Sequence, residues 1–304
     1  MKILIIGGAG YIGCSLAEKL SNIESVNEII IYDNLSANKY NIFSNKKLQN
    51  GKIKFVIADI FDNRSLKKAV QQVDVIYHLA AKVSEPDRAT DGQFFEQVNH
   101  WGTAQLVSEI EQCKTVKKVI YTSSIYVYGH QPNILNEQSA TSPNSFYGVT
   151  KLKGEQQLYR IKDNVDTFIF RVASVFGFNK CVRYNVILNK FLFDAHFFNK
   201  ITIIGDGNQT RPFIHLENLV EALVTPISTE ISPGIYNVAD TVFSINEIVE
   251  AVIGLYPNIE YQYLNKHLDM ASINLQLPDK THQYCTRKDI KLSKRMTEIK
   301  RNLI

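Results

Sequence analysis

The feature that most constrains the fold is the start of the chain, where a short apolar run passes directly into closely spaced glycines. Gly8-Ala-Gly-Tyr-Ile-Gly13 fits the pattern G-x-G-x-x-G, and Gly7, Gly10 and Gly13 also fit a wider three-residue spacing. Glycines let the backbone turn tightly after a strand and approach a pyrophosphate, and the next helix offers free N–H groups to that anion. The start of the chain therefore predicts a strand–turn–helix unit that binds a dinucleotide.

Short Val- and Ile-rich runs alternate with helical stretches through the first half of the chain. Near-continuous apolar strands of this kind are typical of a parallel sheet covered on both faces. The alternation predicts an α/β protein with a Rossmann-like, doubly wound parallel sheet. The expected strands are Lys2–Gly7, Glu28–Asp33, Ile53–Asp59, Val73–Ala80, Val116–Ser123 and Thr167–Phe176, and the expected helices are Tyr11–Ser21, Phe94–Cys113 and Ser145–Arg160.

The alternation loosens after Gly177, although Gly234–Ala239 resembles one more strand of the sheet. We therefore predict two domains, each made of two chain segments. Residues 1–177 and 213–254 would form the NAD-binding Rossmann domain, and residues 178–212 and 255–304 a smaller C-terminal substrate lobe. The lobe is expected over the carboxyl edge of the sheet, where ligands bind in open α/β folds.

Composition is typical of a soluble globular enzyme, with 45% hydrophobic and 21% charged residues among 304. A net charge of +4 predicts no nucleic-acid partner. The basic excess gathers near the end of the chain, which favours the solvated face of a last helix over a tail that binds polyanions. These basic residues are Arg287, Lys288, Lys291, Lys294, Arg295, Lys300 and Arg301.

The four cysteines are widely spaced and form no C-x-x-C pair. This usage predicts reduced thiols in a cytoplasmic protein, and neither a disulfide framework nor a metal site. No apolar run approaches the roughly 18 residues of a membrane span, so no membrane association is expected.

Asp33 adds to the glycine signal because it falls about 20 residues after Gly13, at the end of the second expected strand. A carboxylate in this position accepts hydrogen bonds from the adenosine ribose. Its charge would also repel a 2′-phosphate, so NAD is favoured over NADP. Asp59, after the third strand, is a candidate partner for the adenine amine.

Tyr147 and Lys151 stand four residues apart, and positions i and i+4 share one face of a helix. A neighbouring cation favours the phenolate, so we expect the pKa of Tyr147 to be lowered. Such a phenol can take a proton from an alcohol. Ser123 and Ser124 lie at the end of an earlier expected strand.

Together these motifs resemble the extended short-chain dehydrogenase/reductases, within them the nucleotide-sugar epimerase/dehydratase branch. The likeness runs from residue 2 to about residue 250. It is carried by the glycine turn, Asp33-Asn-Leu35, His78-Leu-Ala-Ala81, Asn99, Ser123-Ser-Ile-Tyr-Val-Tyr-Gly129 and Tyr147-x-x-x-Lys151.

The resemblance implies roles for individual residues. Tyr147 would be the general base, Lys151 would hold the nicotinamide ribose and Ser124 would bind the reacting oxygen. The implied cofactor-binding set is Gly7, Gly10, Tyr11, Ile12, Gly13, Asp33, Asn34, Asp59, Ile60, Leu79, Ala80, Ala81, Lys82, Asn99, Tyr147 and Lys151.

The second lobe carries a further resemblance in Gly205-Asp-Gly-Asn-Gln-Thr-Arg-Pro-Phe-Ile-His215. In the family this segment brings an arginine, here Arg211, to the diphosphate of the sugar nucleotide, which a guanidinium grips well. Arg183 and Asn185 are further candidate substrate contacts, whereas His215 is expected to be structural. A homodimer is also expected, with the two helices before and at Tyr147 as its candidate surface.

The family's 4,6-dehydratases carry an acidic pair after the catalytic hydroxyl, whereas this chain has Ile125 and Tyr126. The resemblance therefore implies an NAD-dependent epimerase of a nucleotide-diphosphate sugar, acting at C4 through a transient 4-keto sugar. Two alternatives stay open. One is a 4-dehydrogenase or 4-keto reductase of a nucleotide sugar, and the other is a non-catalytic NAD-binding regulator.

Overall fold

A computed structural model describes residues 1–48, 51–83, 92–264, 272–277 and 291–303. Its centre is a seven-stranded parallel sheet of order β10-β6-β5-β4-β1-β2-β3, so the predicted Rossmann-like fold is confirmed. The strand order reverses between β1 and β4, where a ligand crevice is expected. The strands are β1 (Lys2–Ile6), β2 (Glu28–Asp33), β3 (Ile53–Ile57), β4 (Val75–His78), β5 (Lys118–Ser124), β6 (Asp166–Val172) and β10 (Gly234–Val238).

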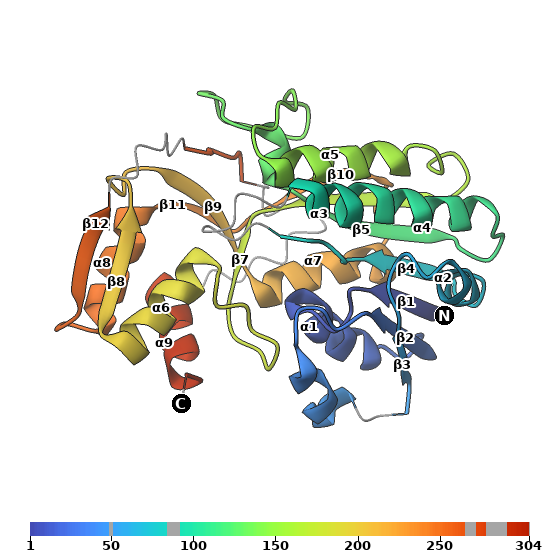
Figure 1. The fold of residues 1–304 in the computed structure, drawn as a ribbon, viewed down its shortest axis with the longest axis horizontal. Helices are drawn as coiled ribbons and strands as arrows, with labels where there is room; N and C mark the ends of the chain where they lie inside the picture. The colour runs from blue at the N-terminus through green and yellow to red at the C-terminus, as the bar shows by residue number, and fades with distance from the viewer. Residues whose placement is uncertain (49–50, 84–91, 265–271, 278–290, 304) are drawn as a thin grey trace.

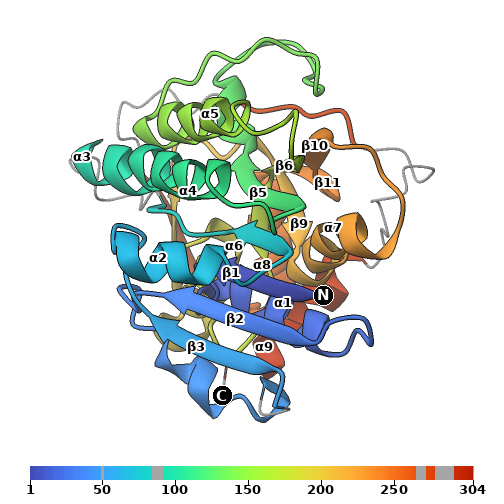
Figure 2. The ribbon, with the colours of Figure 1, turned by 90° about the vertical axis from the view of Figure 1, so that its right-hand side faces the viewer.

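Helices cover both faces of this sheet (Figures 1 and 2). On one face, α1 (Tyr11–Ser21) and α7 (Leu216–Ser228) bury apolar side chains against the strands. On the other face, α2 (Asn63–Val70), α4 (Gly102–Glu111) and α5 (Phe146–Leu158) form a second core. The expected helix over residues 94–113 is three continuous pieces, α3 (Gly92–Phe95), a π-helix η3 (Glu96–Trp101) and α4.

The later part of the chain builds a smaller lobe beside the sheet (Figure 1). Its core is formed by α6 (Ile187–Phe198), α8 (Ile245–Leu255) and α9 (Leu292–Arg301), with the strand pair β8 (Lys200–Ile204) and β12 (Glu260–Leu264). A three-stranded sheet of β7 (Ser174–Phe176), β9 (Thr210–His215) and β11 (Thr241–Ser244) connects the two parts. Short 3₁₀ turns complete the described structure, namely η1 (Tyr40–Ser44), η2 (Lys46–Leu48) and η4 (Ile125–Tyr128).

The single strand expected over residues 167–176 is wrong in one respect. Strand β6 ends at Val172, and Ser174–Phe176 joins a different sheet as β7. The mostly apolar sequence of this segment hides the break, because β-rich composition continues through Phe176. The predicted domain boundaries stay a prediction, and α8, within the segment 213–254, packs in the core of the smaller lobe.

The expected last helix is present as α9, but its basic residues do not all face solvent. Arg295 is buried and its Nη1 atom donates to Glu217 at 2.8 Å. The Nζ atom of Lys300 donates to the Leu255 carbonyl at 2.7 Å and lies over the Tyr256 ring. Arg295 therefore ties α9 to α7, and Lys300 ties it to α8 of the lobe, while Arg287 and Lys288 lie outside the described residues.

Three of the four cysteines fall within the described residues. Cys14, Cys113 and Cys181 carry free thiols there, and Cys285 lies outside that part of the chain. Among the helices that the structure describes, none has the length and apolar character needed to cross a bilayer.

Candidate active site

The glycine turn between β1 and α1 lies against the chain that leaves β4. Gly7 has a φ of +81°, and a Cβ atom there would lie 2.5 Å from the Ala80 nitrogen. The nitrogens of Leu79 and Ala80 both donate to the Ile6 carbonyl at 2.8 Å. Only glycine fits this conformation and this approach. The structure thereby brings Leu79 and Ala80 beside the predicted pyrophosphate turn.

Asp33 is tied to the same turn through its half-buried carboxylate. Oδ2 accepts from the Ala9 nitrogen at 3.0 Å, and Oδ1 accepts from the Leu35 nitrogen at 2.8 Å. Burial raises the pKa of Asp33 and outweighs these two hydrogen bonds, which lower it. Asn34 donates to the Asp59 carboxylate at 2.7 Å, so the residues predicted for the adenosine end gather at one edge of the sheet.

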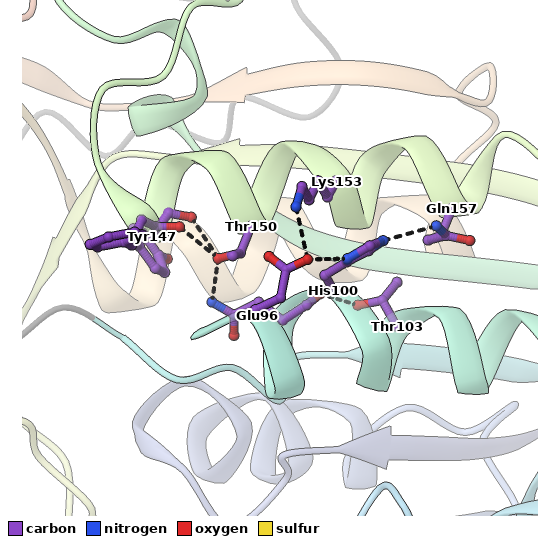
Figure 3. Close-up of polar contacts among 9 residues, drawn as sticks. Glu96, His100, Thr103, Tyr147, Thr150, Lys153 and Gln157 are labelled. Carbon is purple, nitrogen blue, oxygen red and sulfur yellow. Dashed lines mark hydrogen bonds and ion pairs between the residues drawn. The ribbon is translucent and has the colours of Figure 1, made fainter. Parts of the chain in front are cut away.

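Asn99 organises the chain after Ala81. Its side chain accepts from the Lys82 nitrogen at 2.8 Å and donates to the Lys82 carbonyl at 2.9 Å. It also donates to the Thr150 hydroxyl on α5 at 3.1 Å, and Thr150 lies beside Tyr147 on that helix (Figure 3). The predicted cofactor segment is thus fastened to the helix that carries Tyr147. Sequence analysis missed Thr150, which no motif marks.

Two local features bring Tyr147 to Ser124. Ser145 caps α5 by accepting from the Gly148 nitrogen at 3.1 Å. A Cβ atom on Gly148 would lie 2.4 Å from the Tyr126 carbonyl oxygen, so this glycine lets α5 approach the turn that follows β5. Buried Ser124 then lies near the Tyr147 phenol and lowers its pKa.

The predicted low pKa of Tyr147 is wrong for this structure. Burial is the largest influence and raises the pKa, while the Arg183 guanidinium and the Ser124 hydrogen bond lower it in part. The cation that acts on the phenol here is therefore Arg183, from the segment that follows β7. Lys151 was expected in that role. Burial disfavours its charged form, however, and so lowers the pKa of its ammonium group.

Lys151 is only 1% exposed, one helical turn along α5 from Tyr147. Its Nζ atom lies 4.1 Å from the centre of the Tyr121 ring, a favourable contact between a cation and a π system. Burial lowers the pKa of Lys151 to about 7, and the charge of Glu155 opposes that shift.

A buried ion pair between Arg171 and Glu155 lies behind these groups. Ser123 of β5 and Arg171 of β6 are register partners, so both side chains face α5. Glu155 accepts from Arg171 Nε at 3.1 Å and Nη2 at 2.8 Å, and also from the Ser123 hydroxyl. The signal for Glu155 was its position four residues after Lys151, which puts both on one helix face.

The predicted substrate residues lie on two separate segments. Arg183 donates from Nε to the Asn185 side chain, close enough to Tyr147 to influence its pKa. Arg211 lies in β9, and its Nη1 atom donates to the Thr210 carbonyl at 2.8 Å. His215 caps α7, in keeping with the structural role expected for it.

The remaining predicted cofactor residues line or support the same edge. Tyr11 is buried and its hydroxyl donates to the Gly177 carbonyl at 2.7 Å. Ile12 and Gly13 lie in the first turn of α1, while Ile60 is buried in the core that α2 and α4 share. Ala81 is half-buried just after β4.

A surface hollow of about 570 Å³ lies elsewhere, between α1, α7 and α9. Its charged side chains are paired, with Lys19 on Glu221 and Lys47 on Glu18, each at 2.5 Å. It contains none of the predicted catalytic residues. We therefore place the candidate site at the carboxyl edge of the sheet.

The fold and the Ser–Tyr–Lys arrangement together define a dinucleotide-binding enzyme of the short-chain dehydrogenase/reductase class. Residues 3–239 match the family described as NAD dependent epimerase/dehydratase, and the chain belongs to that family. Membership confirms the predicted enzyme class and the NAD cofactor.

Individual relatives agree with this membership. A putative UDP-glucose 4-epimerase of Methanocaldococcus jannaschii is 33% identical over 227 residues, which cover 72% of this chain and 71% of the relative. A UDP-glucose 4-epimerase of Mycolicibacterium smegmatis is 31% identical over 231 residues, covering 74% and 72%. A solved UDP-glucuronic acid 4-epimerase from Bacillus cereus, in complex with UDP-glucuronic acid and NAD, is 25% identical with a TM-score of 0.87, covering 100% and 99%.

The close approach at Gly148 generates a first prediction. Gly148→Ala should push α5 away from the turn after β5 and misplace Tyr147, lowering kcat by about 10²-fold. Gly254→Ala on α8 is the matched control, because a Cβ atom there meets open space. Steady-state turnover and melting temperature of both variants test this. Equal kcat in the two variants would show that the approach is not needed.

The charge state of Lys151 generates a second prediction. Its folded pKa of about 7 lies below its ordinary value of 10.5, so the unfolded chain binds more protons between these pH values. Lys151→Met should therefore stabilise the nucleotide-free protein most near pH 7, and this advantage should shrink towards pH 10. The change is on the order of 1.4 kcal/mol for each unit of pKa shift.

Denaturant unfolding at several pH values measures that difference. Lys153→Met, on the same helix but half-exposed beside Glu96, is the control and should show no such trend. A stabilisation by Lys151→Met that does not change with pH would contradict a buried, weakly charged lysine.

Proposed function

We propose that this enzyme epimerises a nucleotide-diphosphate sugar at C4 through a transient 4-keto sugar. The observation that carries the proposal is the place of buried Ser124 near Tyr147, whose pKa it lowers, with Lys151 one turn along the helix, at the carboxyl edge of the sheet. Ile125 and Tyr126 follow the catalytic serine where a dehydratase would need an acidic pair, which favours epimerisation over elimination of water.

In this proposal each side chain has one task. Tyr147 takes the proton from the C4 hydroxyl and returns it to the same oxygen after the sugar has presented its opposite face. Ser124 hydrogen-bonds that oxygen and orients it. Lys151 holds the nicotinamide ribose from the buried side. Bound NAD would supply the reversible hydride acceptor for C4 and would be unchanged overall.

The described residues fit NAD at its adenosine and pyrophosphate ends. Gly10 caps α1 without a side-chain hydrogen bond, which suits a phosphate at the amino end of that helix, and the Asp33 carboxylate at the turn suits a ribose hydroxyl pair. We assign the binding of NAD to Gly7, Gly10, Tyr11, Ile12, Gly13, Asp33, Asn34, Asp59, Ile60, Leu79, Ala80, Ala81, Lys82, Asn99, Tyr147 and Lys151.

For the substrate we assign Ser124, Arg183, Asn185 and Arg211. The influence of Arg183 on the Tyr147 phenol supports a place beside the sugar. Arg211 is the candidate for the diphosphate, because a guanidinium can bind phosphate oxygens in a bidentate manner.

A third prediction tests the base and the cofactor. Tyr147→Phe should lower kcat by about 10²- to 10⁴-fold, because the proton acceptor is lost. Tyr159→Phe, at the exposed end of the same helix, should leave kcat unchanged. Full turnover by the Tyr147 variant on any accepted sugar nucleotide would rule out this base.

The same preparation separates the alternatives. Denatured protein should release NAD or NADH, and UDP-, GDP-, CDP- and dTDP-sugars should be screened for product and for net NADH. An epimerase forms the C4 epimer with no net NADH, whereas a 4-dehydrogenase or 4-keto reductase changes the NADH level. Bound NAD with no turnover of any sugar would favour a regulator.

We also infer that the protein is a homodimer that packs through the outer face of α3, η3 and α5. This face exposes three large apolar side chains, Phe94 at 56%, Trp101 at 55% and Phe146 at 60%. Glu96 of η3 connects this helix to α5, because it binds His100 of η3 at 2.7 Å and Lys153 of α5 at 2.8 Å (Figure 3). Exposed apolar side chains gathered on a braced surface are typical of an interface.

A fourth prediction tests the dimer. Trp101→Glu should convert the protein to a monomer in light scattering after size exclusion, because it places a charge in the apolar interface. Phe198→Glu is the control, since Phe198 is 66% exposed on α6 in the other lobe. A dimer that survives Trp101→Glu but not Phe198→Glu would move the interface to the smaller lobe.

The cytoplasmic location expected from the cysteine usage is a proposal too. It is supported by the buried positions of Cys14 and Cys181, which act as small apolar side chains in the core.

A further inference from the structure

Among the residues that the structure describes, the site has one buried carboxylate near two buried cations. Glu155 is fully buried, and Arg171 and Lys151 are 4% and 1% exposed. The Arg171 guanidinium engages both Glu155 oxygens, with Nε at 3.1 Å and Nη2 at 2.8 Å. This Glu155–Arg171 pair is neutral overall. If Arg171 were the only partner of Glu155, the carboxylate would have no role at Lys151.

The helix geometry gives Glu155 a second partner. Glu155 follows Lys151 by four residues on α5, so both side chains project from the same face towards the sheet. The Lys151 ammonium rests over the Tyr121 ring, and the Glu155 charge acts on it against the effect of burial. A buried ammonium without a nearby anion gives up its proton readily.

Within the described part of the chain, the other groups around Lys151 cannot supply that negative charge. His78 of β4 is buried and stays neutral, because burial and the lysine charge lower its pKa to about 3. Tyr121 of β5 stays a neutral phenol, because burial raises its pKa far above the ordinary value. Tyr147 has a raised pKa as well, and Thr103 of α4 offers only a hydroxyl.

The position of Glu155 is fixed from three elements at once. Ser123 at the end of β5 donates its hydroxyl to Oε1, and its register partner Arg171 holds both oxygens from β6. The helix itself supplies the third attachment. Ser123 immediately precedes Ser124, so the anion is also fastened to the strand end that carries the serine of the site.

We propose that Glu155 is a positioning residue of the active site, whose carboxylate, held by Arg171 and Ser123, keeps the Lys151 ammonium charged and in place beside Tyr147. This inference rests on the role proposed above for Lys151. It assigns to Glu155 the negative charge that this role requires. A merely structural Glu155 would neutralise Arg171 and leave Lys151 unaffected.

The fifth prediction separates charge from shape. Glu155→Gln keeps the size and the acceptor oxygen for Ser123 but removes the charge, and Glu155→Asp keeps the charge on a shorter side chain. The holoenzyme is labelled with lysine carrying ¹³C at Cε, and the Lys151 signal, identified by its loss in Lys151→Arg, is titrated by NMR. We expect the midpoint to fall by about one pH unit in Glu155→Gln and to stay near the wild-type value in Glu155→Asp.

Glu96→Gln is the matched control, because Glu96 pairs with Lys153 of the same helix at a half-exposed site. It should leave the Lys151 midpoint unchanged. The alkaline limb of kcat against pH should move with the NMR midpoint, down in Glu155→Gln and not in Glu155→Asp. An unchanged midpoint in Glu155→Gln, or an equal change in both Glu155 variants, would overturn the proposal.

The two readouts keep this inference distinct from the proposed function. If no sugar nucleotide is turned over, the epimerase proposal fails, while the NMR midpoint still decides whether Glu155 holds the charge on Lys151. If turnover occurs and the midpoint does not move, the positioning role fails and the epimerase proposal stands.

Discussion

All strands of a parallel sheet end on the same edge, and the candidate site depends on that constraint. The turn after β1 and the last residues of β2, β4 and β5, namely Asp33, His78 and Ser124, come together there although they span more than a hundred residues of sequence. The order reverses between β1 and β4, which opens space for a ligand at this edge. Helix α5, which packs on one face of the sheet, contributes Tyr147 and Lys151.

Burial of charge is the second constraint, because it sets what these groups can do. Burial raises the pKa of Tyr147 and lowers that of Lys151, so each is driven towards its neutral form. The protein offsets this with Arg183 near the phenol and with Glu155 near the ammonium. A site that activates an alcohol therefore needs charged side chains beyond the tyrosine and the lysine.

Much of this arrangement was predictable from the sequence because the responsible signals are local. The glycines are closely spaced, and Tyr147 and Lys151 are four residues apart. Asp33 and Ser124 each lie at the end of a strand. Their family resemblance is confirmed by the match over residues 3–239. The break after Val172 was missed because apolar composition alone does not show which sheet a strand joins.

Other groups could not be predicted because their partners are distant in the chain. Thr150 reaches Asn99, and Arg183 reaches Tyr147, across long separations that no motif records. The sign of the Tyr147 pKa shift depends on how much of its surface the fold covers. Sequence spacing identifies which side chain lies nearby, but it does not show how deeply the phenol is buried.

The sequence by itself determined the class of fold and the family and indicated the candidate catalytic residues, since these follow from local patterns and side-chain types. Only the tertiary structure decided which charges act on which groups. The register of β5 and β6 places Ser123 beside Arg171, and the packing of α5 brings Glu155 onto both. Electrostatic effects depend on distance and solvent exposure, and both are set by the packed fold.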